Sequence, residues 1–390
     1  MQRSVDSSVP EPDADARAHS DRLRAEIARA IDAADGFLPF DRYMQMALYA
    51  PGLGYYVAGA PKFGAAGDFV TAPELTPLFG RTLAAQVDSI LDATQRREIV
   101  ELGAGSGKLA ADLLSALAAM GKLAARYFII EVSAELRERQ QATIERLAPS
   151  ELARVEWTTQ LPPRIEGAVV MNEVLDAVPV HLIARRGGVW LERGVRLEDG
   201  RLEWAERPLR DARLTALAAK RFPAAGDYAS ELNPASEALV EHVGRRLAMG
   251  ALLIVDYGFT RAEYYLPERI DGTLMGHYRH RAHDDPFLWP GLSDLTAHVD
   301  FTAIAEAGEG AGLAVAGFTT QASFLLGCGL LDRLRETGAP ESLAYLREAS
   351  AVQTLTSMSG MGELFKVLAL ARDGGIDWKG FALSDRSHRL

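Results

Sequence analysis

Three glycines alternate with other residues directly after a short apolar segment. Gly103, Gly105 and Gly107 follow Glu98–Leu102, which has the length of a strand, and a helical pattern begins at Leu109. Glycine lets the backbone turn sharply and approach a ligand closely, and the N-terminus of the following helix offers free N–H groups. The segment therefore predicts a ligand-binding loop between a buried strand and a helix.

The spacing within this loop separates three classes of ligand. A phosphate-binding loop would need glycine at position 102 and serine or threonine at position 109, where the chain has Leu102 and Leu109. A dinucleotide-binding loop would need glycine at position 108, where the chain has Lys108. Glu101 precedes the first glycine, and a carboxylate there favours a cationic ligand. The pattern E-x-G-x-G-x-G resembles motif I of class I S-adenosylmethionine (SAM) methyltransferases, whose ligand carries a sulfonium and an ammonium group.

A second carboxylate follows the next predicted strand. Glu131 closes the apolar segment Tyr127–Glu131, and ligands gather at the carboxyl edge of open parallel sheets. There Glu131 could accept both ribose hydroxyls of the cofactor, whereas the alternative is a solvated strand end. Ser133 is the expected N-cap of a helix over Ala134–Leu147. The series of acid, loop, helix, strand and acid predicts a SAM site.

Blocks of sequence far from the loop carry a more specific likeness. They are YMQMALYAPGLGYY (Tyr43–Tyr56), FGAAGDFVTAPELTPLFG (Phe63–Gly80), ELGAGSGKL (Glu101–Leu109), EVSAELRERQ (Glu131–Gln140), NEVLDAVPVH (Asn172–His181), VDYG (Val255–Gly258), PGLSDLTAHVDF (Pro290–Phe301) and GMGELFKVL (Gly360–Leu368). In this order they resemble the MidA-like methyltransferases, whose mitochondrial members are assembly factors for respiratory complex I. The likeness runs from about residue 35 to about residue 370. Ala104 and Ser106 depart from the proline and arginine that family members commonly have there.

The resemblance implies a SAM-dependent methyltransferase. In the mitochondrial members the methyl acceptor is an arginine of a complex I core subunit, which is dimethylated symmetrically, so a protein substrate of that kind is the expected partner here. Two alternatives remain open. The chain could methylate a small molecule or another protein side chain, or it could be an assembly chaperone that keeps the SAM fold with little turnover, because fold and cofactor do not fix function.

Polar residues after the strand Gly167–Met171 are the first candidates for the reaction itself. An arginine acceptor arrives protonated, and carboxylates can hold its guanidinium in a fixed fork. Asn172 could bind the acceptor, and Glu173 and Asp176 could hold a cation. The alternative is a helix N-terminus that is capped by Asn172 and favoured by nearby acids.

Two further segments supply candidates, the first of them largely through the family resemblance. In Gly67–Glu74, Asp68 and Thr71 could close over the cofactor, or they could cap a helix. In the His- and Asp-rich segment, His298 or Asp300 could face the methyl acceptor, and structural hydrogen bonding is the alternative. The histidine spacing matches no helical zinc motif, so no metal is expected. Asp256 ends a strand at the same predicted edge. The expected cofactor contacts are Asp68, Thr71, Glu101, Gly103, Ala104, Gly105, Gly107, Glu131, Val132 and Asn172, and the expected catalytic residues are Asn172, Glu173, Asp176 and His298.

Composition bounds the possible partners and surroundings. The chain has 390 residues and a net charge of −11, so a general electrostatic grip on nucleic acid is not expected. The one cysteine, Cys328, cannot form an internal disulfide. No apolar stretch approaches the ~18 residues of a membrane span, and the acidic N-terminus resembles neither a secretory signal nor a mitochondrial transit peptide. We therefore expect a cytoplasmic protein without membrane insertion.

Alternating helix and strand patterns must position these residues. They predict an α/β fold, and the resemblance makes it a class I SAM-methyltransferase (Rossmann-like) sheet with a helical N-terminal cap, a β-hairpin addition and an inserted irregular segment. Expected helices include Ser20–Ala34, Phe40–Tyr49, Arg81–Asp92, Leu109–Met120, Asn233–Ala248, Ser323–Leu334 and Leu343–Ser357, and further expected strands are Ala251–Asp256 and Leu364–Leu370. The expected organisation is a disordered tail over 1–20, the cap over 21–92, a SAM-binding core over 93–188 and 233–260, the hairpin and linker over 189–232, a substrate-facing insertion over 261–322, and C-terminal helices with the last core strand over 323–390.

Overall fold

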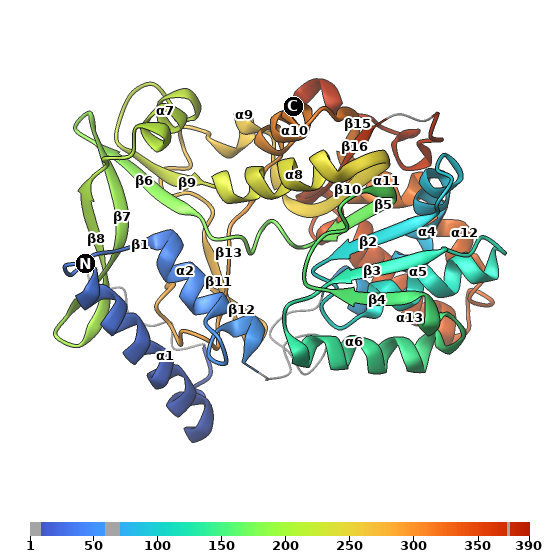
Figure 1. Ribbon diagram of the computed structural model, residues 1–390, viewed down its shortest axis with the longest axis horizontal. Helices are drawn as coiled ribbons and strands as arrows, with labels where there is room; N and C mark the ends of the chain where they lie inside the picture. Colours follow the sequence, from blue (N-terminus) through green and yellow to red (C-terminus); the bar gives the residue numbers. More distant parts are fainter. Residues whose placement is uncertain (1–8, 59–70, 373–374) are drawn as a thin grey trace. The chain divides into compact units, whose positions relative to one another are not determined.

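The chain divides into two compact units in the computed structural model, which describes residues 9–58, 71–372 and 375–390. The first, called the hairpin unit here, comprises Met1–Phe69, Asp176–Ser236 and Arg261–His298. The second, called the sheet unit, comprises Val70–Leu175, Glu237–Thr260 and Val299–Leu390. Figure 1 shows the elements of both units.

These divisions differ from the expected ones in several places. Residues 70–92 belong to the sheet unit and not to an N-terminal cap. Residues 176–188 belong to the hairpin unit and not to the core. Of the expected insertion over 261–322, residues 299–322 belong to the sheet unit. The chain therefore leaves the sheet directly after the polar residues that follow its central strand.

The sheet unit is built on a mixed sheet in the order β15-β16-β10-β5-β2-β3-β4, with the short strand β14 paired to the end of β10. Strands β4, β3, β2, β5 and β10 run parallel, and β16 is antiparallel to both β10 and β15. The bounds are β2 (Glu98–Leu102), β3 (Arg126–Ile130), β4 (Val155–Thr158), β5 (Ile165–Asn172), β10 (Leu247–Phe259), β14 (Val299–Asp300), β15 (Ala314–Thr320) and β16 (Phe365–Arg372).

Helices cover both faces of this sheet, because successive strand residues alternate between the faces. Ile99 and Val170 pack into a core with α4 and α5, whereas Val100 and Val169 pack into a second core with α8 and α10. In Figure 1, α8 and α10 lie across the sheet from α4 and α5. The helices of the unit are α3 (Ala72–Leu75), α4 (Pro77–Asp92), α5 (Lys108–Ala119), α6 (Ala134–Leu147), most of α8 (Pro234–Arg246), α10 (Phe301–Gly310), α11 (Gln321–Gly327), α12 (Leu330–Arg335), α13 (Leu343–Thr356) and α14 (Met361–Leu364), with short 3₁₀ turns η2 (Pro149–Arg154), η3 (Lys379–Phe381) and η4 (Ser387–Arg389).

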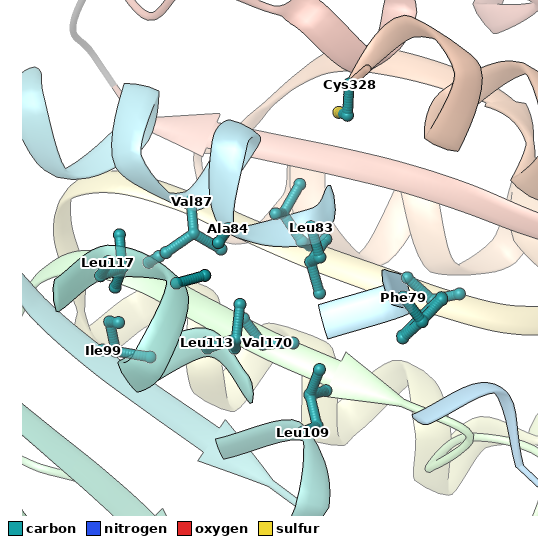
Figure 2. Packing of buried hydrophobic residues seen from close by; sticks show 14 of the residues in the cluster. Phe79, Leu83, Ala84, Val87, Ile99, Leu109, Leu113, Leu117, Val170 and Cys328 are labelled. Atoms are coloured by element: carbon teal, nitrogen blue, oxygen red, sulfur yellow. The ribbon is translucent and has the colours of Figure 1, made fainter. Parts of the chain in front are cut away.

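The first of these cores fixes the helix that begins at the glycine loop. Figure 2 shows side chains of α4 facing side chains of α5 above the strands. Leu83 and Val87 of α4 and Leu113 and Leu117 of α5 are fully buried. Each such side chain contributes on the order of 2 kcal/mol on burial, so the N-terminus of α5 is held firmly against the sheet.

The expected single helix over Ser323–Leu334 is wrong in one respect. The segment forms α11 and α12, which are separated at Cys328 and Gly329. Gly329 has φ +86°, a left-handed conformation that ends the helical path. Elsewhere the pattern located elements closely, since β2, α2 and α6 have the predicted bounds.

The hairpin unit contains an antiparallel sheet in the order β1-β7-β6-β9, with β8 paired to β7. The predicted hairpin is confirmed: Asp199 and Gly200, both with positive φ, form the two-residue turn between β7 and β8. The bounds are β1 (Leu38–Pro39), β6 (His181–Arg186), β7 (Val189–Glu198), β8 (Arg201–Pro208) and β9 (Tyr228–Leu232), with helices α1 (Ala14–Ala33), α2 (Phe40–Tyr49), α7 (Ala212–Arg221) and α9 (Arg261–Tyr264) and the 3₁₀ turn η1 (Tyr55–Val57).

Two expectations for this unit are corrected. The tail predicted as disordered to residue 20 is helical from Ala14, because the Asp13 side chain caps α1 by accepting a hydrogen bond from the Ala16 N–H. The segment expected to be irregular forms a three-stranded antiparallel sheet of β11 (Met275–Tyr278), β12 (Arg281–His283) and β13 (Asp294–Thr296). Its strands have three or four residues, too few for an alternating pattern to stand out in the sequence.

Candidate functional site

The carboxyl ends of four neighbouring parallel strands carry the predicted polar residues of the sheet unit. Glu101 lies in β2, Glu131 follows β3, Asn172 ends β5 and Asp256 lies in β10. Chain order reverses between β2 and β5, since β3 and β4 extend the sheet on one side and β10 and β16 on the other. Ligands of open α/β sheets bind at such a reversal, outside the carboxyl ends of the strands.

The glycine loop adopts the backbone that its sequence predicted. Gly103, Gly105 and Gly107 all have positive φ, at +68°, +52° and +82°. A Cβ on Gly103 would lie 2.7 Å from the Val174 side chain, and one on Gly107 would lie 2.8 Å from the Gln140 Cα. Gly107 is the N-cap of α5, so the loop delivers the N-terminus of that helix to the strand edge.

Glu101 is a buried carboxyl group on the strand that leads into this loop. Its side chain is about 2% exposed, and the Tyr127 hydroxyl donates a hydrogen bond to it at 2.7 Å. Burial raises the pKa of Glu101 to about 7, although the Tyr127 hydrogen bond acts in the opposite direction. The carboxyl group can therefore change its charge near neutral pH in response to a cation.

Glu131 is held in one orientation by the protein. One carboxylate oxygen accepts the Ser133 backbone N–H at 2.8 Å, and the other accepts the Gln140 side-chain amide at 2.9 Å. The adjacent Val132 is 76% exposed, which is unusual for an apolar side chain. A fixed acceptor beside an uncovered apolar side chain fits the ribose and the base of a nucleoside ligand.

The end of β5 places Asn172 and Glu173 together. The Asn172 side-chain amide donates to the Glu173 carboxylate at 3.2 Å, and the same oxygen accepts the Ala72 N–H at 3.4 Å. Within the described chain, the Asn172 side-chain oxygen is buried and accepts no hydrogen bond. Glu173 has φ +53°, a conformation that costs a non-glycine residue of order 1 kcal/mol or more and that is commonest at functional sites.

Two other predicted carboxylates of the sheet unit, Asp256 and Asp300, make hydrogen bonds that stabilise the fold. Asp256 is fully buried, and its carboxylate accepts the N–H groups of Val174 and Leu175 at 3.2 and 2.9 Å, so it holds the chain that leaves β5. Asp300 caps α10 by accepting the Ala303 N–H, which favours the structural alternative. Thr71 precedes α3 without a side-chain cap, and Asp68 lies outside the described residues.

Asp176 and His298 belong to the hairpin unit. The Asp176 carbonyl accepts the Ala297 N–H at 3.0 Å, which brings the backbones of the two predicted segments together. The His298 N–H donates to the Thr273 hydroxyl at 3.0 Å. These bonds fix the backbone at both residues.

Sequence reasoning missed several residues that the structure places at the strand edge. The Gln140 side chain is hydrogen-bonded to both the Trp157 indole and the Glu131 carboxylate, and the Ser106 hydroxyl donates to Glu74. Gln140 is the first buried residue in a helix that is otherwise rich in exposed charges, which is the one sequence feature that sets it apart.

Within residues 9–58, 71–372 and 375–390, no group of three or more His, Cys, Asp or Glu side chains is arranged to hold a metal ion. Burial lowers the pKa values of His277 and His283, and it raises the pKa of the Cys328 thiol to about 12.

No helix in the described part of the chain combines the length and the apolar character needed to cross a membrane.

Comparison with known proteins agrees with this geometry. A family model for S-adenosyl-L-methionine-dependent methyltransferases matches residues 78–319. A solved structure from Burkholderia thailandensis, bound to S-adenosyl-homocysteine, is 50% identical with a TM-score of 0.94, and the match covers 98% of this chain and 100% of that one. A native structure from the same organism gives 50% identity and a TM-score of 0.91, with the same coverage.

Curated relatives are more distant but also match over most of their length. The mitochondrial protein arginine methyltransferase NDUFAF7 of Mus musculus is 29% identical over 84% of this chain and 79% of its own length. The NDUFAF7 homologue of Drosophila melanogaster is 30% identical over 92% of this chain and 87% of its own length. The fold class, the cofactor and the family resemblance expected from the sequence are confirmed by these matches.

Proposed function

Because this chain belongs to the family of S-adenosyl-L-methionine-dependent methyltransferases, we propose that it methylates an arginine side chain of a partner protein. The observation that carries the proposal is that relatives named protein arginine methyltransferases match over most of both chains. From the family resemblance, the proposed partner is a core subunit of respiratory complex I.

The cofactor half of the site follows from the strand edge. When bound, SAM supplies a methyl group already activated by the sulfonium, so the protein has mainly to position the acceptor and control charge. We assign the binding of the ribose hydroxyls to Glu131 and the binding of the amino-acid end to the glycine loop over residues 103–107. We assign the stabilisation of the positive sulfonium charge to the Glu101 carboxylate. The positive φ values of the loop, the fixed Glu131 carboxylate and the raised pKa of Glu101 support these assignments.

The acceptor half is assigned to the end of β5. A guanidinium is planar and protonated, with its charge spread over three nitrogens. The Glu173 carboxylate can hold one edge of that group and take the proton that the methylated nitrogen must lose. The buried Asn172 side-chain oxygen can accept a hydrogen bond from a second nitrogen. Asp176 and His298 stay candidates for contact with the acceptor peptide.

The test is transfer of a labelled methyl group into protein. The purified enzyme is incubated with methyl-labelled SAM and an extract from cells that lack its gene, and labelled proteins are hydrolysed and analysed for methylated amino acids. Label in methylarginine with the wild-type enzyme, and its loss with Glu173→Gln, supports the proposal. Label in another amino acid or in a small molecule would replace the arginine assignment and leave methyl transfer itself intact.

A further inference from the structure

Gln140 is a fully buried amide in a helix that is otherwise mostly exposed. In α6, only Gln140 and Ile144 are buried, although the helix has fourteen residues. Its backbone lies directly against the glycine loop, since a Cβ on Gly107 would come within 2.8 Å of the Gln140 Cα. A polar side chain buried at such a contact needs partners, because an unsatisfied amide costs stability.

Those partners define the orientation of the amide. The Trp157 indole N–H donates to the Gln140 side-chain oxygen at 3.0 Å. The Gln140 side-chain nitrogen donates to the Gly105 carbonyl at 3.2 Å and to the Glu131 carboxylate at 2.9 Å. An indole can only donate and a carboxylate can only accept, so the amide cannot be turned over without losing its bonds.

The amide thereby ties together two parts of the predicted cofactor site. Gly105 belongs to the glycine loop, and Glu131 is the proposed acceptor of the ribose hydroxyls. A carboxylate has about four lone-pair sites, and Gln140 and Ser133 use two of the sites on Glu131. The remaining sites can accept two hydroxyls only while the carboxylate stays in this orientation.

We propose that Gln140 is a positioning residue that, through Glu131 and Gly105, makes the site select a nucleoside with two free ribose hydroxyls. The inference rests on the proposed role of Glu131 as ribose acceptor. Trp157 supports the same function indirectly, because its N–H fixes which end of the Gln140 amide faces the carboxylate. Binding of a 2′-deoxy ligand should then depend less on Gln140, since only one of the two hydroxyl bonds to Glu131 remains to be oriented.

The test uses calorimetric titration with S-adenosylhomocysteine and with its 2′-deoxy analogue. Gln140→Glu keeps the shape and the acceptor for Trp157 but replaces the donors with a second carboxylate beside Glu131. We expect its affinity for S-adenosylhomocysteine at pH 8 to fall at least tenfold, and its affinity for the deoxy analogue to fall less than threefold.

A matched control lies on the next residue of the same helix. Gln141 is exposed, and Gln141→Glu makes the same chemical change without contact to Glu131. It should bind both ligands within twofold of the wild type. Equal losses for the two ligands with Gln140→Glu, or wild-type binding by that variant, would overturn the proposal. If Gln140→Glu does not fold, Gln140→Met, which lacks both donors at similar volume, is titrated with the same two expectations.

Glu131→Ala separates this inference from the one on which it rests. If Glu131→Ala binds S-adenosylhomocysteine as tightly as the wild type, the ribose assignment itself fails. If Glu131→Ala loses affinity while Gln140→Glu and Gln140→Met do not, the ribose assignment stands and Gln140 has only a packing role.

Discussion

The ends of β3 and β5 carry similar polar residues, but the two ends differ in how completely the protein satisfies the hydrogen bonds of these residues. After β3, Glu131 has a hydrogen bond on each carboxylate oxygen, and its partner Gln140 is itself fully bonded. After β5, Asn172 has a buried side-chain oxygen that accepts no hydrogen bond within the described residues, and Glu173 holds a positive φ. One strand end is satisfied by the protein, whereas the other keeps an open acceptor and backbone strain.

The difference matches the two tasks of a methyltransferase. A cofactor with one fixed structure is bound best by groups that are already oriented, because little entropy is then lost on binding. A reacting group must instead be met by acceptors that are completed only when it arrives. Strain and unsatisfied polar atoms cost stability and persist where function requires them. We therefore place selectivity for the cofactor at β3 and reactivity at β5.

The largest expected effect is on the glycine loop. Gly105→Val puts a β-branched side chain at φ +52°, where such residues are strongly disfavoured, and disturbs the carbonyl that accepts the Gln140 amide. We expect affinity for S-adenosylhomocysteine to fall at least ~100-fold, on the scale of a few kcal/mol of local strain, as measured by calorimetric titration.

Gly121→Val is the matched control for this change. Gly121 has φ +68° in the turn after α5, and a Cβ there would meet no atom within 4 Å. It imposes similar backbone strain away from the loop, so binding should stay within twofold of the wild type. If both variants lose affinity equally, backbone strain in the sheet unit and not the loop itself explains the effect.

A substitution of Glu173 tests the proposal that the end of β5 supports the reaction. Glu173→Gly removes the carboxylate and relieves the positive φ, so methyl transfer should fall about 100-fold. The free energy of unfolding should stay constant or rise by up to ~1 kcal/mol. Single-turnover rates on the acceptor that the labelling experiment identifies and denaturant unfolding measure the two quantities, and affinity for S-adenosylhomocysteine should be unchanged.

The opposite pattern would move Glu173 to a structural role. Its carboxylate accepts the Ala72 N–H, so a variant that loses several kcal/mol of stability while its folded fraction still transfers methyl groups would show that the residue mainly links α3 to β5. The contrast between the two strand ends would then rest on Asn172 alone.

Much of the sheet unit could be predicted because many of its elements are determined by residues that are close together in the sequence. The glycine loop, strand β2, the Ser133 cap and the bounds of α6 all follow from residues within one turn or one strand. The same holds for the β7–β8 turn, where Asp199 and Gly200 suit positive φ.

The rest depended on contacts between distant segments. Gln140 looks like any polar helix residue until β4 brings Trp157 to it, and β4 itself is a short edge strand of four residues. Asp256 was predicted as a ligand-site acid, and the sequence did not show that its carboxylate also accepts the N–H groups of residues that follow another strand. Short strands such as β11 and β12 are stabilised by pairing with each other, and their sequences are too short to show a periodic pattern that would predict this pairing.

The pH dependence of cofactor binding should depend on Glu101. Its pKa is raised to about 7 by burial, and a sulfonium favours the ionised form, so SAM binding releases a proton below that pH. The affinity for SAM relative to that for S-adenosylhomocysteine, which lacks the sulfonium charge, should rise about tenfold from pH 6 to pH 8 and become nearly flat with Glu101→Gln. A flat wild-type ratio would mean that Glu101 does not sense the sulfonium.

The same group makes the free protein less stable as pH rises. Between the ordinary pKa of 4.5 and the folded value of about 7, the folded state binds a proton that the unfolded state has lost. The free energy of unfolding should therefore fall over this range, by about 3 kcal/mol in total. Comparing the pH profiles of wild type and Glu101→Gln isolates this contribution from those of other groups.

The smallest effect separates capping from cofactor binding at the end of β3. The Ser133 hydroxyl caps α6 by accepting the Leu136 N–H, while its backbone N–H donates to Glu131. Ser133→Ala removes only the cap, so unfolding should cost about 1 kcal/mol less and affinity for S-adenosylhomocysteine should change less than twofold. A larger loss of affinity would show that the orientation of Glu131 depends on the helix end as a whole, and that the satisfied strand end is less rigid than its hydrogen bonds indicate.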